Sequence, residues 1–315
     1  MLTPENNVIL SLIGPEPNLV TPKLAALGRV VYLKDLAGEE ERITTAVAAY
    51  NQKFPKALLD RLPNLQMIAD FGVGFDGFAL DEIIRRGIRL SYTPGLLSED
   101  VADYGLALLF ALARRIPQAD RFVRSGEWEA GGAFPMGTRF FGKRIGVAGL
   151  GRIGRIIAKR AQAFDMEVGY TAHSKKTDVS YPFFQSLKDL AAWSDFLILV
   201  IPGSAENRHL VNKEVLEALG PQGFLINIAR GSVVDTEALI DALEAGSIAG
   251  AALDVFESEP RVEEALRRSG KTILAPHIGS ATTETREAMA DLVAENMRLF
   301  MAGKPVATPV PGTRP

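Results

Sequence analysis

A short apolar run that leads into a glycine-rich turn and then a helix constrains this chain more than any other feature. Residues 145–148 are the apolar run, 149–154 (GLGRIG) are the turn, and 156–159 continue with a helical pattern. A GxGxxG turn between a strand and a helix places the pyrophosphate of a dinucleotide at the helix N-terminus. The sequence therefore predicts a dinucleotide-binding α/β fold built around this turn.

Each glycine of the turn has a separate expected role. Gly149 permits the tight turn, Gly151 lets the backbone come close to a pyrophosphate, and Gly154 lets the helix pack on the strand. Arg152 and Ile153 lie between them, and their amide N–H groups belong to the predicted phosphate site. The alternative interpretation is a glycine turn without a ligand.

Size and composition exclude several classes of protein. A chain of 315 residues is long enough for two domains, and 47% hydrophobic with 23% charged residues is typical of a globular protein. A net charge of -3 argues against nucleic acid as the main partner. Without cysteine there is no disulfide and no thiolate metal site, and we expect no metal. The start carries no evident signal segment, and the apolar stretch at 106–113 is too short to span a bilayer, so we expect a cytoplasmic protein.

The first part of the chain alternates short apolar runs with helical segments. This alternation predicts a parallel sheet covered by helices on both faces. The predicted strands are 8–12, 30–33, 46–49, 66–69 and 88–91, and the predicted helices are 22–27, 55–62 and 80–86.

A second sheet follows the glycine turn, and its predicted strands are 168–170, 196–200, 224–227, 250–253 and 272–274. Its clearest predicted helices are 213–219 and 236–245, the latter closed by Gly246. A last helix from about 281 to 300 is expected to return to the first domain.

The predicted fold class is therefore α/β with two domains. One is a Rossmann-type doubly wound parallel sheet, the other a smaller flavodoxin-like substrate domain, with the active site in the cleft. The predicted substrate-binding domain is 1–100 with 285–315, and the predicted dinucleotide-binding domain is 101–284. Ser98 is the expected N-cap of a mostly apolar helix over 101–114. Residues 126–142 are a predicted surface excursion, where Trp128 either contacts a second subunit or packs on its own domain.

A Gly-Val-Gly turn at the end of the fourth strand is a candidate anion site. Val73 and Gly74 lie in the segment FGVGFD, and ligands of open α/β sheets bind beyond the carboxyl ends of the strands. Consecutive backbone N–H groups in such a turn can hold a substrate carboxylate. A purely structural turn is an equally good interpretation of these residues alone.

The residues after the second strand of the dinucleotide fold indicate which nucleotide binds. NAD enzymes carry an acidic residue there for the ribose, whereas this chain has Ala172 followed by His173, Ser174 and Lys175. A small residue with hydroxyl and cationic neighbours suits a 2′-phosphate, which a carboxylate would repel. We therefore predict that NADPH is preferred, the alternative being a solvated basic turn.

Polar side chains after three strands of the second sheet are candidates for catalysis. His277 follows the last strand in APHIGSAT, Glu259 follows the fourth in DVFESEP, and Arg230 follows the third in NIARG. An imidazole can donate the proton that accompanies hydride transfer, a carboxylate can hold it protonated, and a guanidinium can bind a carboxylate and a neighbouring carbonyl. Each of these residues alone is more often structural, but the set of three beside one nucleotide motif favours catalysis. Of the other histidines, His173 is assigned near the adenosine and His209 lies in a polar segment.

In combination these segments resemble the D-isomer-specific 2-hydroxyacid dehydrogenase family over essentially the whole chain. The matching motifs, in this order, are GVGFD, YTPG with VAD, GLGRIG, NIARGSVVD, AALDVFESEP and PHIGSAT. Within the family the chain is most similar to NADPH-using glyoxylate, hydroxypyruvate and hydroxyphenylpyruvate reductases, through FPMGTRFFGKRIGVAGLGRIG and GSATTETREAMADLV. A departure is His173, at a position where relatives often carry arginine for the phosphate.

The resemblance implies an activity and roles for individual residues. Hydride passes from NADPH to C2 of a small 2-oxo acid to give the D-2-hydroxy acid, His277 protonates the alkoxide, and Glu259 keeps that histidine charged. Arg230 and the Val73 and Gly74 amides hold the substrate carboxylate. The resemblance also implies an apolar wall of the substrate site, formed by Leu96, Leu97 and Trp128. It further implies cofactor contacts by Ile228 and by Asp254, which accepts a hydrogen bond from the nicotinamide amide. A homodimer formed through the nucleotide domain follows from the resemblance alone.

Two other functions compete with the reductase. A nucleotide-sensing, co-repressor-like protein without turnover shares the fold, but the complete set of Arg230, Glu259 and His277 argues against it. A 3-phosphoglycerate-type dehydrogenase would require extra cations beside Gly74, and FGVGFDGF offers none. The sequence leaves the choice among small 2-oxo acids open.

Overall fold

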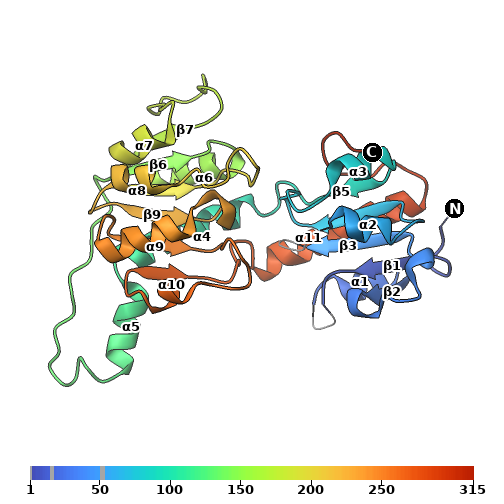
Figure 1. Cartoon of the computed structure of the whole chain (residues 1–315), viewed down its shortest axis with the longest axis horizontal. Helices are drawn as coiled ribbons and strands as arrows, with labels where there is room; N and C mark the ends of the chain where they lie inside the picture. The colour runs from blue at the N-terminus through green and yellow to red at the C-terminus, as the bar shows by residue number, and fades with distance from the viewer. Residues whose placement is uncertain (1, 15–17, 50–53) are drawn as a thin grey trace. The chain divides into compact units, whose positions relative to one another are not determined.

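The chain divides into two compact units in a computed structural model that describes residues 2–14, 18–49 and 54–315 (Figure 1). The first unit comprises Met1–Leu97 with Ala281–Pro315, and the second comprises Ser98–Ser280. The sequence predicted domain boundaries between residues 100 and 101 and between residues 284 and 285. The two units meet slightly earlier in the chain, between residues 97 and 98 and between residues 280 and 281.

The first unit is built on a five-stranded, fully parallel sheet of order β2-β1-β3-β4-β5, which is the flavodoxin-like order. All five predicted strands are present, with ends that differ by one or two residues. Its strands are β1 (Val8–Ser11), β2 (Arg29–Tyr32), β3 (Thr45–Ala49), β4 (Met67–Phe71) and β5 (Arg89–Ser91). β3 and β4 are buried at every position, as expected for central strands with helices on both faces.

Short helices and one long helix cover this sheet. The short ones are α1 (Thr21–Ala25), η1 (Leu33–Asp35), η2 (Glu40–Arg42), α2 (Lys56–Asp60) and α3 (Leu80–Arg85). The long one, α11 (Thr283–Met301), packs on β4 through buried residues that include Met289, Val293 and Met297. After α11 the chain runs beside β5, where Val310 N–H donates to Leu90 O at 2.8 Å. The end of the chain therefore returns to the first unit, as predicted.

The second unit contains a six-stranded parallel sheet of order β11-β10-β9-β8-β6-β7. The chain starts at β6, moves outward to β7, and then crosses to β8 on the other side, which is the doubly wound arrangement. A single parallel bridge between Tyr170 and Phe183 extends the sheet beyond β7. The strands are β6 (Arg144–Ala148), β7 (Glu167–Thr171), β8 (Phe196–Leu199), β9 (Phe224–Asn227), β10 (Gly250–Leu253) and β11 (Thr272–Leu274).

The helices of the second unit confirm some predictions and correct one. α8 (Lys213–Leu219) and α9 (Thr236–Ala245) have the predicted bounds, and Gly246 closes α9 in the left-handed conformation. The predicted N-cap at Ser98 is wrong because α4 (Ser98–Ala113) already begins at that residue, three positions before the predicted start. The other helices are α5 (Ile116–Arg124), α6 (Arg152–Ala163), α7 (Leu187–Trp193), η3 (Gly231–Val233) and α10 (Glu264–Arg268).

Helix α4 lies close against the sheet of its own unit. A Cβ built on Gly105 would come within 2.6 Å of the Ile228 side chain, so glycine at this position lets the helix approach the end of β9. Leu106, Leu109 and Leu112 are buried beside it. This packing explains why the sequence of α4 is apolar over most of its length.

An irregular arm follows α5, over residues 125–143. Figure 1 shows it as a long trace that leaves the body of the second unit. It rejoins the unit where Phe140 packs on Phe110 of α4, with ring centroids 4.4 Å apart. The predicted surface excursion is therefore present.

None of the helices in the described part of the chain is both long enough and apolar enough to cross a membrane.

Candidate active site

The glycine turn after β6 has the geometry of a phosphate-binding turn. Gly149 has φ of 103°, and its Cβ would lie 3.0 Å from Val200 O, so both conformation and space require glycine. A Cβ on Gly154 would lie 2.0 Å from Gly149 O, so the first turn of α6 rests directly on the loop. A Cβ on Gly151 would meet nothing within 4 Å, which leaves open space in front of that residue.

That open space coincides with the start of α6. Gly151 is the N-cap residue, and it has no side chain to cap the first N–H groups of the helix, which begins at Arg152. Unpaired N–H groups and the positive end of the helix dipole favour an anion at this point. The residues present therefore fit a dinucleotide pyrophosphate.

The turn after β7 is basic and lacks a carboxylate at the ribose position. Ala172 follows the last residue of the strand, and His173, Ser174 and Lys175 are exposed. Among the residues that the structure describes, none provides a side-chain partner for His173, Ser174 or Lys175. This turn therefore fits a 2′-phosphate.

The buried carboxylate of Asp254 organises the loop that carries the candidate catalytic histidine. Asp254 follows β10 and is 2% exposed, and its two oxygens accept the N–H groups of Ile278 and Gly279, each at 2.9 Å. The His277 N–H donates to Asp254 O at 2.9 Å, and His277 has φ of 56°, a conformation uncommon for a residue other than glycine. Asp254 thus holds the backbone that presents His277, a positioning role that sequence reasoning missed.

Burial also sets the ionisation of the groups around Asp254. Desolvation raises the pKa of the Asp254 carboxyl, and the two N–H bonds offset part of that effect. Burial raises the pKa of Tyr104 to about 12, with a smaller contribution from the charge of Asp254.

His277 and Glu259 form a hydrogen-bonded pair. His277 Nδ1 lies 2.9 Å from Glu259 Oε2, and Glu259 Oε1 accepts the N–H of Phe256 at 2.9 Å. Burial alone would raise the pKa of Glu259, but the His277 hydrogen bond and charge outweigh it, so the pKa lies below its usual value. Glu259 is therefore an ionised carboxylate that orients the imidazole, with Nε2 on the far side of the ring.

Arg230 is presented by an asparagine at the end of β9. The Asn227 amide donates to Arg230 O at 3.0 Å and accepts the N–H of Ala229 at 3.0 Å, so it closes the turn on both sides. Arg230 Nη1 donates to Ala229 O at 2.7 Å. Asn227 is almost completely buried, and this side-chain-to-backbone bonding is the usual behaviour of asparagine in turns.

A second histidine–glutamate pair supports the segment that bears Glu259. Glu257 accepts from His209 Nε2 at 2.9 Å, from Arg208 Nη2 at 2.6 Å, and from the Thr236 hydroxyl at 3.3 Å. Burial opposes ionisation of Glu257, yet the bonds from His209 and Arg208 leave its pKa lowered. His209, which the sequence placed only in a polar segment, ties the loop after β8 to the DVFESEP segment.

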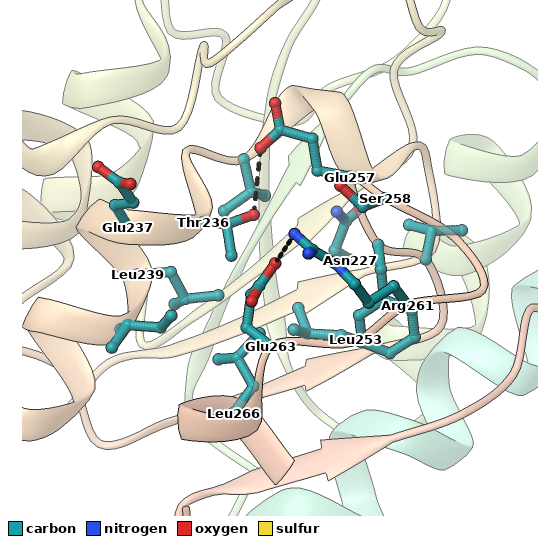
Figure 2. A pocket seen from close by; sticks show the side chains of 15 residues that line it. Asn227, Thr236, Glu237, Leu239, Leu253, Glu257, Ser258, Arg261, Glu263 and Leu266 are labelled. Atoms are coloured by element: carbon teal, nitrogen blue, oxygen red, sulfur yellow. Dashed lines mark hydrogen bonds and ion pairs between the residues drawn. The ribbon is translucent and has the colours of Figure 1, made fainter.

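A hollow of about 450 Å³ lies next to this segment, between α9 and the loop after β10. Figure 2 shows the side chains that line it. The Thr236 hydroxyl bonds Glu257 on one side, and an ion pair between Arg261 and Glu263 at 2.8 Å lies on the other. Neither His277, Glu259, Arg230 nor the glycine turn lines it. Their neighbours Asn227, Gly231 and Ser258 do line it, so the hollow lies behind the turns that carry Arg230 and Glu259.

The Gly-Val-Gly turn lies in the first unit, directly after β4. Thr93 fixes it, because its N–H and its hydroxyl donate to Gly72 O at 2.8 and 2.9 Å. Within the described residues, the N–H groups of Val73 and Gly74 have no protein acceptor. This turn therefore suits a carboxylate, and the TPG motif has an identifiable part in holding it.

The other predicted contact residues are found in both units. Leu96, 38% exposed, and buried Leu97 belong to the first unit, whereas buried Ile228 and Trp128, 67% exposed, belong to the second. The structure thus brings together His277, Glu259 and Asp254 at the ends of β10 and β11, with Arg230 after the adjacent β9.

Comparison with known proteins agrees with the fold. Residues 106–279 match the model of the D-isomer specific 2-hydroxyacid dehydrogenase, NAD binding domain, and the chain belongs to this family. Its similarity to individual members extends well beyond the matched domain.

Two relatives and one solved structure illustrate that similarity. The hydroxyphenylpyruvate reductase of Plectranthus scutellarioides is 44% identical over 275 residues, 87% of this chain and 88% of that protein. The glyoxylate/hydroxypyruvate reductase A of Arabidopsis thaliana is 47% identical over 253 residues, 80% of each chain. The crystal structure of an NADPH-dependent glyoxylate/hydroxypyruvate reductase of Sinorhizobium meliloti, in complex with NADP and malonate, superposes with a TM-score of 0.92 at 37% identity and covers 98% of each chain.

Proposed function

We propose that this protein is an NADPH-dependent reductase of small 2-oxo acids, of the glyoxylate and hydroxypyruvate type, that forms the D-2-hydroxy acid. The observation that carries the proposal is the His277–Glu259 pair, with Nδ1 and Oε2 2.9 Å apart, in the unit that holds the glycine turn. The relatives named as glyoxylate, hydroxypyruvate and hydroxyphenylpyruvate reductases support the same activity.

The chain's own residues account for binding and proton transfer. The N–H groups of Val73 and Gly74 bind the substrate carboxylate, and the Arg230 guanidinium binds the carboxylate together with the neighbouring carbonyl oxygen. Glu259 holds His277 through Nδ1 and pairs with the positive charge of the ring. The Nε2–H of His277 then donates the proton that the developing alkoxide requires.

Cofactor recognition is assigned to two segments of the second unit. Gly149, Gly151 and Gly154, with the N–H groups that start α6, hold the pyrophosphate, and His173, Ser174 and Lys175 hold the 2′-phosphate. When bound, NADPH supplies the hydride. We place Asp254 beside the nicotinamide, since each carboxylate oxygen that accepts one backbone N–H has a second lone pair for the carboxamide.

The matched variants His277→Asn and His209→Asn test this function. Both histidines have φ near +55° and pair with a glutamate, and asparagine tolerates that backbone conformation. With NADPH and hydroxypyruvate or glyoxylate, we expect kcat to fall by about 10²–10⁴ for His277→Asn and by less than about tenfold for His209→Asn. Near-wild-type turnover of His277→Asn would remove His277 as the acid.

The same assay separates the competing functions. Oxidation of NADPH on addition of a 2-oxo acid excludes a nucleotide sensor without turnover, and a panel ranked by kcat/KM separates small 2-oxo acids from 3-phosphoglycerate-type substrates. We expect kcat/KM to be higher with NADPH than with NADH because no carboxylate replaces Ala172. Comparable values would contradict the cofactor assignment.

We also propose that the protein is a homodimer, with the arm over 125–143 at the subunit interface. The support is the apolar side chains that this arm exposes, including Trp128 and Met136, 67% and 95% exposed. Location in the cytoplasm stays a prediction.

A further inference from the structure

A second hollow, of about 460 Å³, lies in the first unit at the end of the sheet where strands β4 and β5 begin. Its charged lining residues are Arg86, Arg89 and Arg314, and no aspartate or glutamate lines it. The rest of the lining is mainly apolar or glycine, namely Leu2, Leu65, Phe300, Met301, Gly87 and Gly303, with Gln66. Three cations therefore share one hollow in a chain whose net charge is -3.

This hollow is distant from the proposed carboxylate site of the same unit. Gln66 immediately precedes β4 and Arg89 opens β5, whereas Val73 and Gly74 follow the opposite end of β4. A five-residue strand separates these two ends by roughly 13 Å. The hollow is therefore not part of the substrate site.

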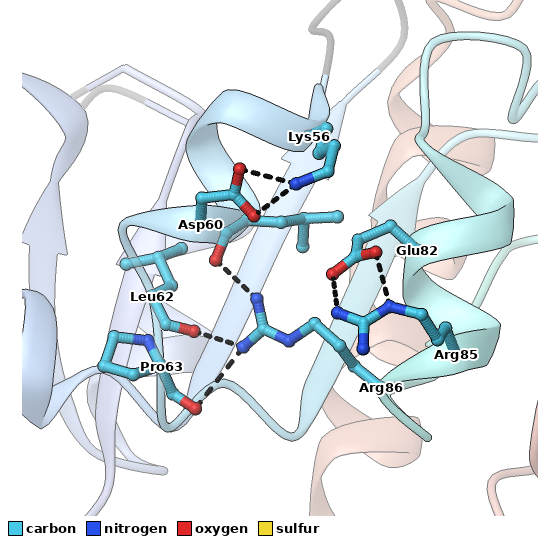
Figure 3. Close-up of polar contacts among 8 residues, drawn as sticks. Lys56, Asp60, Leu62, Pro63, Glu82, Arg85 and Arg86 are labelled. Carbon is cyan, nitrogen blue, oxygen red and sulfur yellow. Dashed lines mark hydrogen bonds and ion pairs between the residues drawn. The ribbon is translucent and has the colours of Figure 1, made fainter.

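Neutral groups hold Arg86 without cancelling its charge. Its guanidinium donates to the backbone oxygens of Leu59, Leu62 and Pro63 at the end of α2, as Figure 3 shows. The adjacent Arg85 differs, because it forms a two-bond ion pair with Glu82. Of these two neighbouring arginines, only the one that lines the hollow lacks an acidic partner.

The other two arginines that line the hollow also lack an acidic partner in the described part of the chain. Arg89 donates to Lys304 O at 3.2 Å and stacks over the Phe300 ring, with its Cζ 5.3 Å from the ring centroid. Arg314 forms a parallel backbone bridge with Arg89, which brings the two residues side by side, and it is exposed. In the described ranges of the chain, no carboxylate pairs with Arg86, Arg89 or Arg314.

We propose that this hollow binds a small phosphate-bearing anion. Guanidinium groups present paired N–H donors that match phosphate oxygens, and a multiply charged anion would neutralise cations that now repel one another. The stacking of Arg89 on Phe300 and its bond to Lys304 O orient one of these donors before a ligand arrives. The apolar wall of Leu65 and Phe300 would contact the uncharged part of such a molecule.

Titration of the holoenzyme with sodium pyrophosphate tests the proposal. Saturating NADP occupies the glycine turn, and constant ionic strength controls for general screening. We expect binding at one site per chain, and a Kd that rises by about tenfold or more in Arg314→Ala and in Arg89→Gln. The amide introduced by Arg89→Gln would keep a donor for Lys304 O, and thermal unfolding of each variant reports whether the fold is intact.

Arg85→Ala is the matched control, since it removes one positive charge from the same unit at a residue that is already paired with Glu82. Its Kd for pyrophosphate is expected to stay within about twofold of wild type. No pyrophosphate binding to the holoenzyme, or equal weakening in Arg85→Ala and Arg314→Ala, would overturn the site. Binding of citrate without binding of pyrophosphate would overturn the phosphate assignment.

Discussion

At the scale of single residues, the candidate site depends on carboxylates whose burial is offset by specific donors. Glu259 accepts from His277 and from Phe256 N–H, and Asp254 accepts from two backbone N–H groups. For Glu259 the donors prevail and the pKa is lowered, whereas for Asp254 burial prevails and the pKa is raised. Glu259 accepts a hydrogen bond from the His277 imidazole in addition to one backbone N–H, whereas Asp254 accepts two backbone N–H groups.

The lowered pKa of Glu259 gives a pH-dependent contribution to stability. A carboxylate whose folded pKa lies below its ordinary value of 4.5 stabilises the protein fully above that pH, and the contribution is lost as pH falls through the lowered value. We expect Glu259→Gln to lower the free energy of unfolding by roughly 1–3 kcal/mol at pH 7. The difference from wild type should shrink below pH 4.5.

Urea unfolding of wild type and Glu259→Gln at pH 7 and at low pH measures this difference. Glu263→Gln is the control, because Glu263 pairs with Arg261 at the surface and should change stability little at either pH. A loss in Glu259→Gln that did not vary with pH would show that packing, and not ionisation, is responsible.

At the scale of elements, the glycine turn between β6 and α6 contains one glycine that is needed for folding and another that is expected to matter for binding. Gly154 is fixed by packing, since its Cβ would overlap Gly149 O, whereas Gly151 faces open space with φ of -82°, which alanine can adopt. The two glycines of one motif therefore have different physical reasons for being glycine.

Two alanine substitutions test that difference. Gly154→Ala should lower Tm by roughly 5 °C because the added methyl group must displace the turn. Gly151→Ala should change Tm by less than about 2 °C and yet raise the Kd for NADPH by about tenfold or more, since its methyl group occupies the proposed pyrophosphate position. Thermal unfolding and a fluorescence titration measure the two quantities. Unchanged NADPH affinity in Gly151→Ala would contradict the assignment of that space to the pyrophosphate.

At the scale of the whole molecule, the arm over 125–143 leaves several large apolar side chains exposed, namely Trp128, Met136 and Phe141. Phe134 packs on Phe122 of α5 and Phe140 packs on Phe110 of α4, so the arm has defined contacts at its middle and near its end. Between these contacts Met136 is 95% exposed. An ordered arm with uncovered apolar side chains is typical of a surface that another chain buries.

Charged substitutions in the arm should shift the molecule from dimer to monomer. We expect the double variant Trp128→Asp, Met136→Asp to sediment as a monomer at concentrations where wild type is a dimer, because an interface would have to bury two unpaired carboxylates. Ile84→Asp, at an exposed apolar residue of α3 in the other unit, should leave the oligomeric state unchanged. An unchanged sedimentation coefficient for the double variant would place the interface elsewhere.

The strands were predictable because buried parallel strands are nearly continuous runs of apolar residues, as in β3, β4 and β8. The start of α4 was not predictable in the same way, because Ser98 has the chemistry of an N-cap and yet α4 includes it. Turn residues such as Ser98 carry local signals for a cap and for a first helical position alike, and tertiary packing chooses between them.

The sequence by itself determined the α/β class, the dinucleotide turn and the strand-end candidates Arg230, Glu259 and His277, because strand period, glycine spacing and motif order are local properties of the chain. Only the tertiary structure decided that Asp254 clamps the backbone of His277, that His209 holds Glu257, and that Arg314 lines the same hollow as Arg86 and Arg89, from which it is far apart in sequence. These are contacts between segments that the chain brings together only when its sheets form, and no local pattern encodes their distances.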